Sequence, residues 1–188
     1  FNFSVNCNLL KTIFQNLILK NKLSNGIIYL QITRGVQSRE HAYKKKLKPN
    51  VIVYTAKKKF NLPNKNYRGF KAITYPDIRW GRPDIKTTSL LANIIAATEA
   101  SKKGAYEAIL VKGEKITEAA HSNVWIVKGN KIITHPANKE ILKGVTRTVL
   151  INLIHSLGLK LIEKEFSLKE LYKSDEVFIT SSGSLVTP

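Results

Sequence analysis

Histidine and cysteine, which can do chemistry, and closely spaced glycines, which can bind phosphate, form none of the common catalytic or binding motifs in this sequence. The ten glycines never stand at the Gly-x-Gly-x-x-Gly or Walker spacings that hold phosphates. No Gly-x-Ser-x-Gly elbow and no His-Glu-x-x-His occur. The lone Cys7 leaves neither a disulfide within the chain nor a thiolate metal cage. Metal-ligand spacing is also lacking among His41, His121, His135 and His155. We therefore expect no metal site.

Single residues with useful groups remain, but taken one at a time they favour ordinary structural roles. Lys86 offers an amine at the end of a segment dense in glycine, proline and charge, yet most lysines are solvated surface residues. Glu118 offers a carboxylate of the kind found at exposed strand ends. Thr146 offers a hydroxyl where a helix is expected to begin, as an ordinary cap would. These residues alone predict a soluble α+β domain and no particular activity.

Hydrophobic periodicity predicts the elements that must position these residues. The first part is expected to hold a helix and two strands, over residues 6–21, 27–33 and 51–55. The polar loop between the strands carries Arg39 and His41. A polar stretch at 57–68 is a candidate boundary, so we expect two domains, 1–60 and 61–188.

The second part is predicted to be richer in strands. Strands are expected at 70–75, 108–112, 124–127, 131–134, 159–165 and 176–180, and helices at 146–157 and 167–172. The strands at 108–112, 124–127 and 131–134 are predicted to form a β-meander, because Gly113 and Gly129 mark tight turns. A further helix, capped by Thr88 or Ser89 and ending at Gly104, should bury Leu90, Leu91, Ile94, Ile95 and Ala97.

The net charge of +18 would attract nucleic acid or anionic lipid. The lysines are scattered along the chain, and isoleucine and asparagine, whose codons are A/T-rich like those of lysine, are abundant. We therefore interpret the high charge as the result of an A/T-rich gene, which places many lysines on solvent-exposed faces. A polyanion-binding surface stays open as the alternative, although no nucleic-acid-binding motif supports it. No apolar run approaches the roughly 18–20 residues that span a bilayer, and no signal stands out, so we expect a cytoplasmic protein.

Seven separated segments, in order and across nearly the whole chain, resemble the class IV aminotransferases. They are QITRG at 31–35, REHAY at 39–43, DIK at 84–86, TEAAHSNV at 117–124, THPAN at 134–138, ILKGVTR at 141–147, and TSS at 180–182 with Thr187-Pro188. The Arg39-x-His41-x-Tyr43 loop is most similar to the D-amino acid aminotransferases of that family. The resemblance implies an α+β, fold-type-IV architecture: a partial small α/β domain in 1–60, and in 61–188 a larger β-rich pseudo-barrel domain that lacks its C-terminal end.

The resemblance also implies a cofactor, pyridoxal 5'-phosphate, and a role for each matching residue. Lys86 would form the Schiff base with the cofactor and shuttle the substrate α-proton. Glu118 would pair with the pyridinium nitrogen, and Leu142 would pack against the ring. The phosphate would be held by Val145, Thr146 and Ser182.

The substrates implied are D-amino acids such as D-alanine and D-glutamate, which would exchange their amino group with 2-oxo acids. Arg39 and His41 would bind the substrate carboxylate, for which a guanidinium fork is suited. The family takes this loop from the opposite subunit, which implies a homodimer.

Three alternatives to this function remain. A branched-chain aminotransferase or an aminodeoxychorismate lyase shares several of the segments. A catalytically inactive, truncated remnant of the family is the second, because the family's small domain begins well upstream of Phe1. The same hypothesis is motivated by His121, which stands where serine is common in the D-amino acid enzymes. A basic nucleic-acid-binding module is the third.

Overall fold

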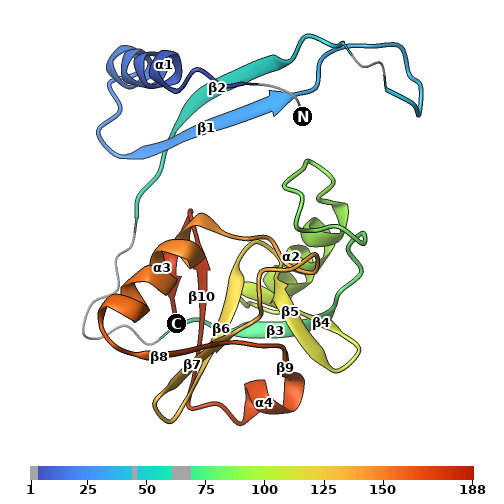
Figure 1. Cartoon of the computed structure of the whole chain (residues 1–188), viewed down its shortest axis with the longest axis vertical. Helices are drawn as coiled ribbons and strands as arrows, with labels where there is room; N and C mark the ends of the chain where they lie inside the picture. The colour runs from blue at the N-terminus through green and yellow to red at the C-terminus, as the bar shows by residue number, and fades with distance from the viewer. Residues whose placement is uncertain (1–3, 44–45, 61–68) are drawn as a thin grey trace. The chain divides into compact units, whose positions relative to one another are not determined.

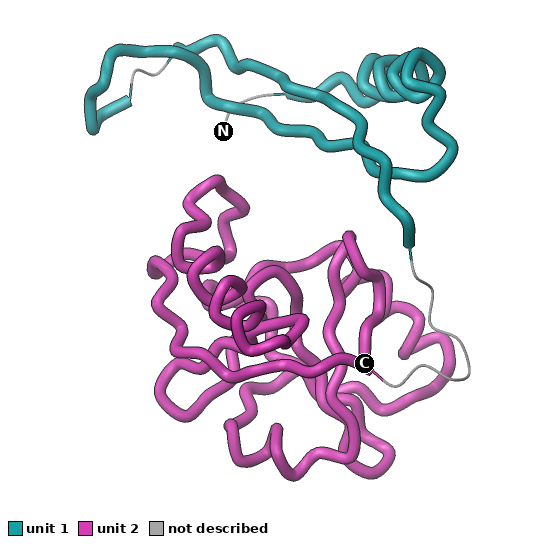
Figure 2. The backbone as a smooth tube through the Cα atoms, turned by 180° about the vertical axis from the view of Figure 1, so that it is seen from behind, with its two compact units in different colours: residues 1–60 teal, residues 61–188 magenta. Residues whose placement is uncertain are grey.

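The structure is a computed structural model that describes residues 4–43, 46–60 and 69–188. The chain forms two compact units, Phe1–Phe60 and Asn61–Pro188, which Figure 2 colours separately. Their helices and strands are labelled in Figure 1.

The first unit consists of a helix and a β-hairpin. Helix α1 (Cys7–Lys20) begins at Asn6, whose side-chain oxygen accepts a hydrogen bond from the backbone N–H of Leu9 at 3.0 Å. This cap satisfies one of the backbone donors that a helix start leaves free. Strands β1 (Gly26–Thr33) and β2 (Asn50–Lys57) pair antiparallel. The predicted helix and both predicted strands are confirmed.

The described part of the second unit, residues 69–188, contains two mixed β-sheets and three helices (Figure 1). One sheet has the order β3-β4-β5-β9, formed by Ala72–Pro76, Glu107–Lys112, Lys115–Ala119 and Phe166–Ser167. The other has the order β11-β10-β6-β7-β8, formed by Leu185–Thr187, Glu176–Ser181, Asn123–Lys128, Lys131–Thr134 and Lys160–Glu163. The helices are α2 (Leu91–Lys102), α3 (Val145–Ser156) and α4 (Leu168–Tyr172).

Each sheet contains one pair of parallel neighbours joined by a helical crossover. Strands β3 and β4 are parallel and α2 connects them, while β7 and β8 are parallel and α3 connects them. In each crossover the loop before the helix leaves the carboxyl end of a strand, at residues 77–90 and 135–144. Ligands of α/β sheets commonly bind at such ends, so these two loops are where a site is expected.

The predicted β-meander was wrong in one respect. The turn at Gly113 joins β4 to β5, and the turn at Gly129 joins β6 to β7, but the two hairpins belong to different sheets. The chain changes sheet through a tight turn in which Ala119 N–H donates to the Ser122 carbonyl at 2.7 Å. Turn signals are local, whereas sheet membership depends on packing with distant strands such as β10.

Helix α2 packs through a different face from the predicted one. Its buried residues are Ala96 and Ala100, whereas Leu91 and Ile94 are 72% and 58% exposed. Small side chains let the helix axis approach the strand beneath it closely, and Ala108 of β4 belongs to the same buried cluster. The helix begins after Leu90, which makes no side-chain cap, so the cap predicted at positions 88–89 was also wrong.

The larger hydrophobic core of the second unit draws on both sheets. Buried apolar side chains in it come from β4, β5, β6, β7, β9, β10 and α4; they include Ile109, Ile116, Val124, Ile126, Ile133, Phe166, Leu171 and Ile179. Trp125, also fully buried, donates its indole N–H to Thr180 Oγ1 at 2.9 Å. This rigid core holds the ends of β5, β6 and β7 in fixed positions.

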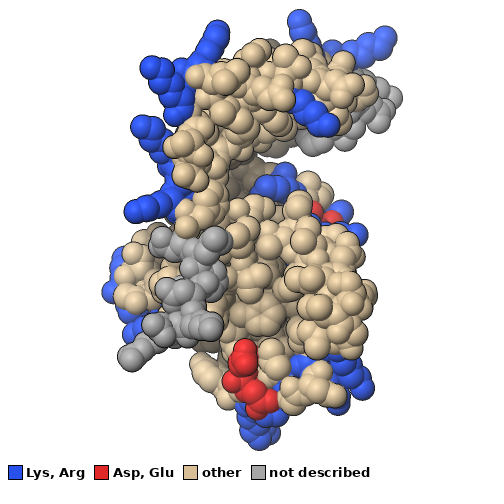
Figure 3. Space-filling model, turned by 90° about the vertical axis from the view of Figure 1, so that its left-hand side faces the viewer, with Lys and Arg blue, Asp and Glu red and all other residues tan. Residues whose placement is uncertain are grey.

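Basic side chains are distributed over both units. On the face drawn in Figure 3, lysine and arginine occur on each unit and do not gather in one continuous patch. Among the described residues, no helix is long and apolar enough to cross a membrane.

Candidate active site

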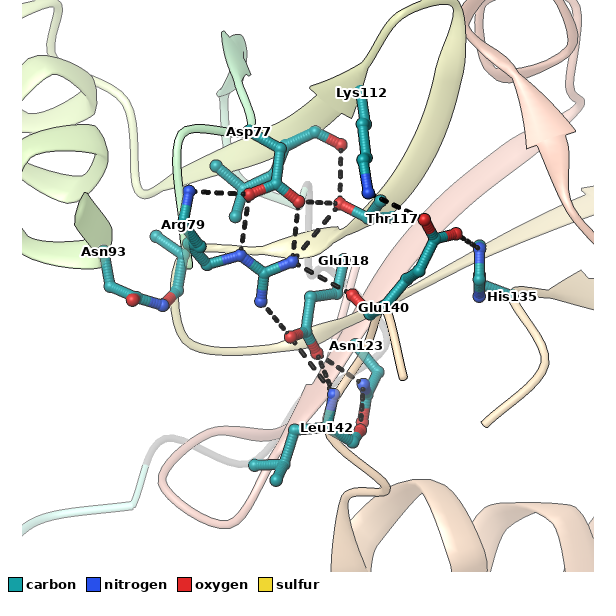
Figure 4. A network of polar contacts seen from close by, with 12 residues as sticks. Asp77, Arg79, Asn93, Lys112, Thr117, Glu118, Asn123, His135, Glu140 and Leu142 are labelled. Atoms are coloured by element: carbon teal, nitrogen blue, oxygen red, sulfur yellow. Dashed lines mark hydrogen bonds and ion pairs between the residues drawn. The ribbon is translucent and has the colours of Figure 1, made fainter. Parts of the chain in front are cut away.

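The loops that follow β3 and β7 meet at Glu118, near the end of β5 (Figure 4). Arg79, from the first loop, donates a hydrogen bond to the Glu118 carboxylate. Leu142, from the second loop, donates its backbone N–H to both carboxylate oxygens at 3.2 Å. Asn123, at the start of β6, donates to Glu118 at 2.9 Å and to the Leu142 carbonyl at 2.8 Å. Three separate segments thus converge on one buried carboxylate.

Arg79 connects the two loops through most of its guanidinium donors. It forms a bidentate pair with Asp77, at 2.9 Å from Nε and 2.7 Å from Nη2. Nη2 also reaches the Glu140 carbonyl at 3.2 Å, and Thr117 donates to Asp77 at 2.7 Å. A buried guanidinium needs such partners, because an unpaired buried charge is strongly unfavourable.

The charges of this network perturb one another. Burial raises the pKa of Glu118 to about 7, although the attraction of Arg79 opposes the change. Burial also pushes the pKa of Asp77 upward, but hydrogen bonds from Arg79 and Thr117 outweigh it and leave that pKa below its ordinary value. Near neutral pH, Glu118 is therefore poised between its neutral and ionised forms, and a nearby positive charge would favour the ionised form.

Gly144 allows the second loop to pass close to Asn123. A Cβ atom at this position would lie 2.4 Å from the Asn123 side-chain oxygen, which is far inside van der Waals contact. The Asn123 amide cannot move away without weakening its bonds to Glu118 and Leu142. The glycine therefore places the start of α3 beside the carboxylate network.

Helix α3 begins at this glycine with its first-turn N–H groups uncapped. Its N-cap residue has no side chain, and no acidic residue stands in the first turn. Backbone donors at such an end, with the helix dipole, favour an anion. Val145 and Thr146, both predicted to bind phosphate, lie in this first turn. Two of the three predicted phosphate-binding residues thus directly follow Gly144, which approaches Asn123 of the carboxylate network.

The third predicted phosphate-binding residue, Ser182, lies in the turn between β10 and β11 and is exposed. The hydroxyls ordered around that turn belong to its neighbours. Ser181 Oγ lies 2.8 Å from Ser184 Oγ and accepts the Ser184 N–H at 3.1 Å. The assignment of Ser182 to the cofactor phosphate therefore stays a prediction.

Lys86 lies in the loop between β3 and α2, and its side chain is exposed. The structure gives its amine no hydrogen bond or ion pair with another described residue. The loop itself is anchored at both ends: Arg79 binds Glu118 at one, and Asn93 of α2 donates to the Ala120 carbonyl at 2.7 Å at the other. The lysine is thus carried by a segment tied at two points to the strand end that bears Glu118.

Arg39 and His41, predicted to bind the substrate carboxylate, lie in the first unit. Both side chains are exposed, in the loop that joins β1 to β2. In the same loop the Arg34 guanidinium stacks over the Tyr43 ring at 3.6 Å from its centroid. The role of Arg39 and His41 in binding the substrate carboxylate stays a prediction.

His121 takes part in a polar group of its own. Its Nδ1 lies 2.8 Å from the carboxylate of buried Glu107 and 3.0 Å from Ser122 Oγ, which itself donates to Glu107 at 2.9 Å. The ring is half exposed and packs edge-on against Tyr106. These contacts fix the orientation of the histidine beside the turn that follows Glu118.

Sequence reasoning missed the residues that hold Glu118 in place. Asp77 and Arg79 lie in the segment, dense in glycine, proline and charge, that ends at Lys86, and Asn123 lies within the matching segment 117–124. An Asp-x-Arg pair directly after a predicted buried strand was the available signal, because such a pair binds itself and leaves one guanidinium edge for another acid.

The comparisons with known proteins agree over nearly the whole chain. The sequence model described as Amino-transferase class IV matches residues 1–188. D-alanine aminotransferases of Listeria monocytogenes (serotype 1/2a) and Bacillus licheniformis are 38% and 41% identical over 181 and 180 residues. In both cases the match covers 95% of this chain and 63% of the relative, so the chain spans less than two thirds of these relatives' length.

Solved structures agree on the fold. The branched-chain amino acid aminotransferase of Escherichia coli superposes with a TM-score of 0.83 at 25% identity. The superposition covers 100% of this chain and 64% of that one. The predicted fold class and the predicted family are thus confirmed, and this chain belongs to the class IV aminotransferases.

Proposed function

We propose that the chain is part of a pyridoxal-phosphate-dependent transaminase that exchanges the amino group between D-amino acids, such as D-alanine and D-glutamate, and 2-oxo acids. The observation that carries the proposal is the buried Glu118 carboxylate, held by Arg79, Leu142 and Asn123 beside the uncapped start of α3. The D-alanine aminotransferase relatives support the choice of D-amino acids. The single cysteine in 188 residues suits a cytoplasmic location.

The residues present fit the cofactor. A carboxylate offers about four acceptor positions, and Glu118 receives hydrogen bonds from three protein groups, which leaves a position for a ring N–H. The uncapped first turn of α3, with Val145 and Thr146, suits a phosphate. The close approach at Gly144 keeps these two features adjacent.

Each of these residues would then have a defined task. Bound pyridoxal phosphate supplies an electron-withdrawing ring that stabilises negative charge at the substrate Cα. Glu118, in its ionised form, would hold a proton on the ring nitrogen, and Arg79 favours that ionised form and keeps the carboxylate in place. Leu142 packs against the ring, and Lys86 Nζ holds the cofactor and moves the proton to and from the substrate Cα.

Substrate binding is proposed for Arg39 and His41. A guanidinium and an imidazole together suit the α-carboxylate that all the proposed substrates share. The loop that carries them is proposed to serve the site of a second copy of the chain, so the enzyme would act as a homodimer.

The first test is reaction of the purified chain with pyridoxal phosphate, followed by borohydride and peptide mapping. We expect a visible absorption band that borohydride fixes onto the peptide containing Lys86. A Lys86→Ala variant should lack the band. Lys131→Ala, which removes another exposed lysine, should keep it. Labelling spread over many lysines, unchanged in Lys86→Ala, would instead favour the catalytically inactive remnant.

A second test addresses the substrate. With D-alanine and 2-oxoglutarate we expect pyruvate formation that L-alanine does not support. Preference for L-leucine would point to the branched-chain enzymes of the family instead.

A third test addresses the dimer. Mixing inactive Lys86→Ala chains with inactive Arg39→Ala chains should restore up to roughly a quarter of the wild-type activity. This follows because a mixed dimer of the proposed kind has one intact site, and half of the dimers are mixed after statistical exchange. No recovery, with dimers verified by light scattering, would place the arginine in its own subunit's site.

A further inference from the structure

The loop that brings Leu142 to Glu118 also carries part of a second polar cluster, which the proposed transaminase chemistry does not use. His135 and Glu140 lie in this loop, and Glu165 lies between β8 and β9. One possible ligand atom from each of the three falls within 4.8 Å of the other two. Figure 4 shows the His135 ring and the Glu140 carboxylate facing each other.

His135 is the fixed point of this cluster. Its side chain is 1% exposed, and Nδ1 lies 2.9 Å from the Pro136 carbonyl, to which only an N–H can donate. Nδ1 therefore carries the proton, and Nε2 turns toward the two glutamates. Nε2 is buried and has no hydrogen-bond partner among the residues that the structure describes.

A lone pair on Nε2 that faces carboxylate oxygens is electrostatically unfavourable unless a positive group lies between them. A second proton on the ring would not make a hydrogen bond here, since Nε2 is 3.7 Å from Glu140 Oε2. A metal ion would satisfy all three groups. Histidines that bind metals usually donate their other ring N–H to a carbonyl or carboxylate, as His135 does to Pro136.

The two carboxylates have atoms available for this purpose. Glu140 uses Oε1 for Lys112, at 2.8 Å, and turns Oε2 toward the histidine. Glu165 is 38% exposed and pairs with Lys115 through Oε2, so its other oxygen, Oε1, can face the cluster.

We propose that His135, Glu140 and Glu165 form a binding site for a divalent transition-metal ion of the Zn²⁺ class. One imidazole and two carboxylates, without thiolate, are ligands that Zn²⁺ accepts. Bond lengths of about 2.0–2.2 Å require ligand atoms about 3.3 Å apart; the partly exposed glutamates can supply this closure by side-chain rotation while His135 stays fixed.

The ion would also brace the carboxylate network. Glu140 accepts a hydrogen bond from Arg79 through its carbonyl, and Leu142, two residues later, binds Glu118. A metal-bound Glu140 side chain would therefore hold the backbone that supports Glu118. Sequence reasoning missed the site because Glu165 stands thirty positions beyond His135, outside any short metal-binding spacing.

The test is titration of the full chain with Zn²⁺ by calorimetry, together with NMR of the histidine ring nitrogens. We expect one binding event that Glu140→Gln and Glu165→Gln each weaken tenfold or more. Glu99→Gln, which removes a partly exposed, lysine-paired glutamate of α2, should bind as the wild type does. Zn²⁺ should shift the His135 Nε2 resonance, and near-UV circular dichroism should confirm that all variants are folded.

Three outcomes would overturn the proposal. Equal Zn²⁺ affinity in all variants, or shifts confined to the rings of His41 and His155, would mean binding at exposed histidines only. No measurable binding would mean that the cluster is filled by a proton or by water. None of these outcomes depends on the transaminase activity, so the two proposals fail separately.

Discussion

Glu118 is held as an acid whose charge depends on its neighbours. Its side chain is 7% exposed, and Arg79, itself 4% exposed, is its only charged donor among the described residues. Burial alone would keep the acid neutral, whereas the proposed cofactor needs it ionised. A pKa of about 7 lets the arrival of a cationic ring decide its charge at neutral pH.

The raised pKa predicts a stability change between pH 4.5 and 7. A group whose pKa is higher in the folded state stabilises the protein fully below its unfolded pKa, near 4.5, and loses that contribution as pH rises through about 7. The wild type should therefore lose up to about 3 kcal/mol of unfolding free energy relative to Glu118→Gln across this window. Urea denaturation at pH 4.5, 6 and 8 measures the difference, and a constant difference would contradict the raised pKa.

Removal of Arg79 should be costly. Arg79→Gln leaves the buried carboxylates of Asp77 and Glu118 without their cation, and we expect a loss of about 3–5 kcal/mol. Arg82→Gln breaks an exposed pair with Asp84, which water screens, and should leave the stability nearly unchanged. Thermal or urea unfolding of both variants tests the contrast, and similar losses would show that the Arg79 network does not stabilise the fold.

At the scale of elements, the two crossovers place the site. The loops after β3 and β7 both leave the carboxyl end of a parallel strand, and they meet where β5 ends and β6 begins. The predicted strands and helices were confirmed in type at most positions. The meander and the buried face of α2 were not, because each depends on which surface lies opposite. Ala96 fits against its sheet although Leu91 is the more hydrophobic residue.

Gly144, at the start of α3, is a position where the addition of a single methyl group should lower the stability of the fold. Its backbone is compatible with any residue, so Gly144→Ala should act only through the added Cβ, which meets the Asn123 oxygen. We expect a loss of about 1–3 kcal/mol and weaker pyridoxal phosphate binding. Gly81→Ala adds a Cβ with nothing within 4 Å and should change neither quantity. Equal behaviour of the two variants would mean that Asn123 moves freely.

At the scale of the whole molecule, each unit has its own set of contacts. Of the described chain, the second unit holds the two larger sheets and both buried hydrophobic clusters. We expect a polypeptide of residues 61–188 to unfold cooperatively, with Trp125 changing from a buried to an exposed fluorescence spectrum at the midpoint. A gradual, non-cooperative transition would show that this unit needs the first unit, or a partner chain, to fold.

The amino-acid sequence by itself determined the family, because seven short segments kept their residue types and order, and it determined most elements, because helical and strand periodicity are local properties. It also predicted Glu118 and Leu142 as neighbours of one cofactor, and the structure joins these two residues by a hydrogen bond; their roles stay predictions. Only the tertiary structure decided that Arg79 and Asn123 hold Glu118, and that His135 faces Glu140 and Glu165. These contacts join residues up to about forty positions apart. They depend on how sheets and crossovers pack, which no local pattern encodes.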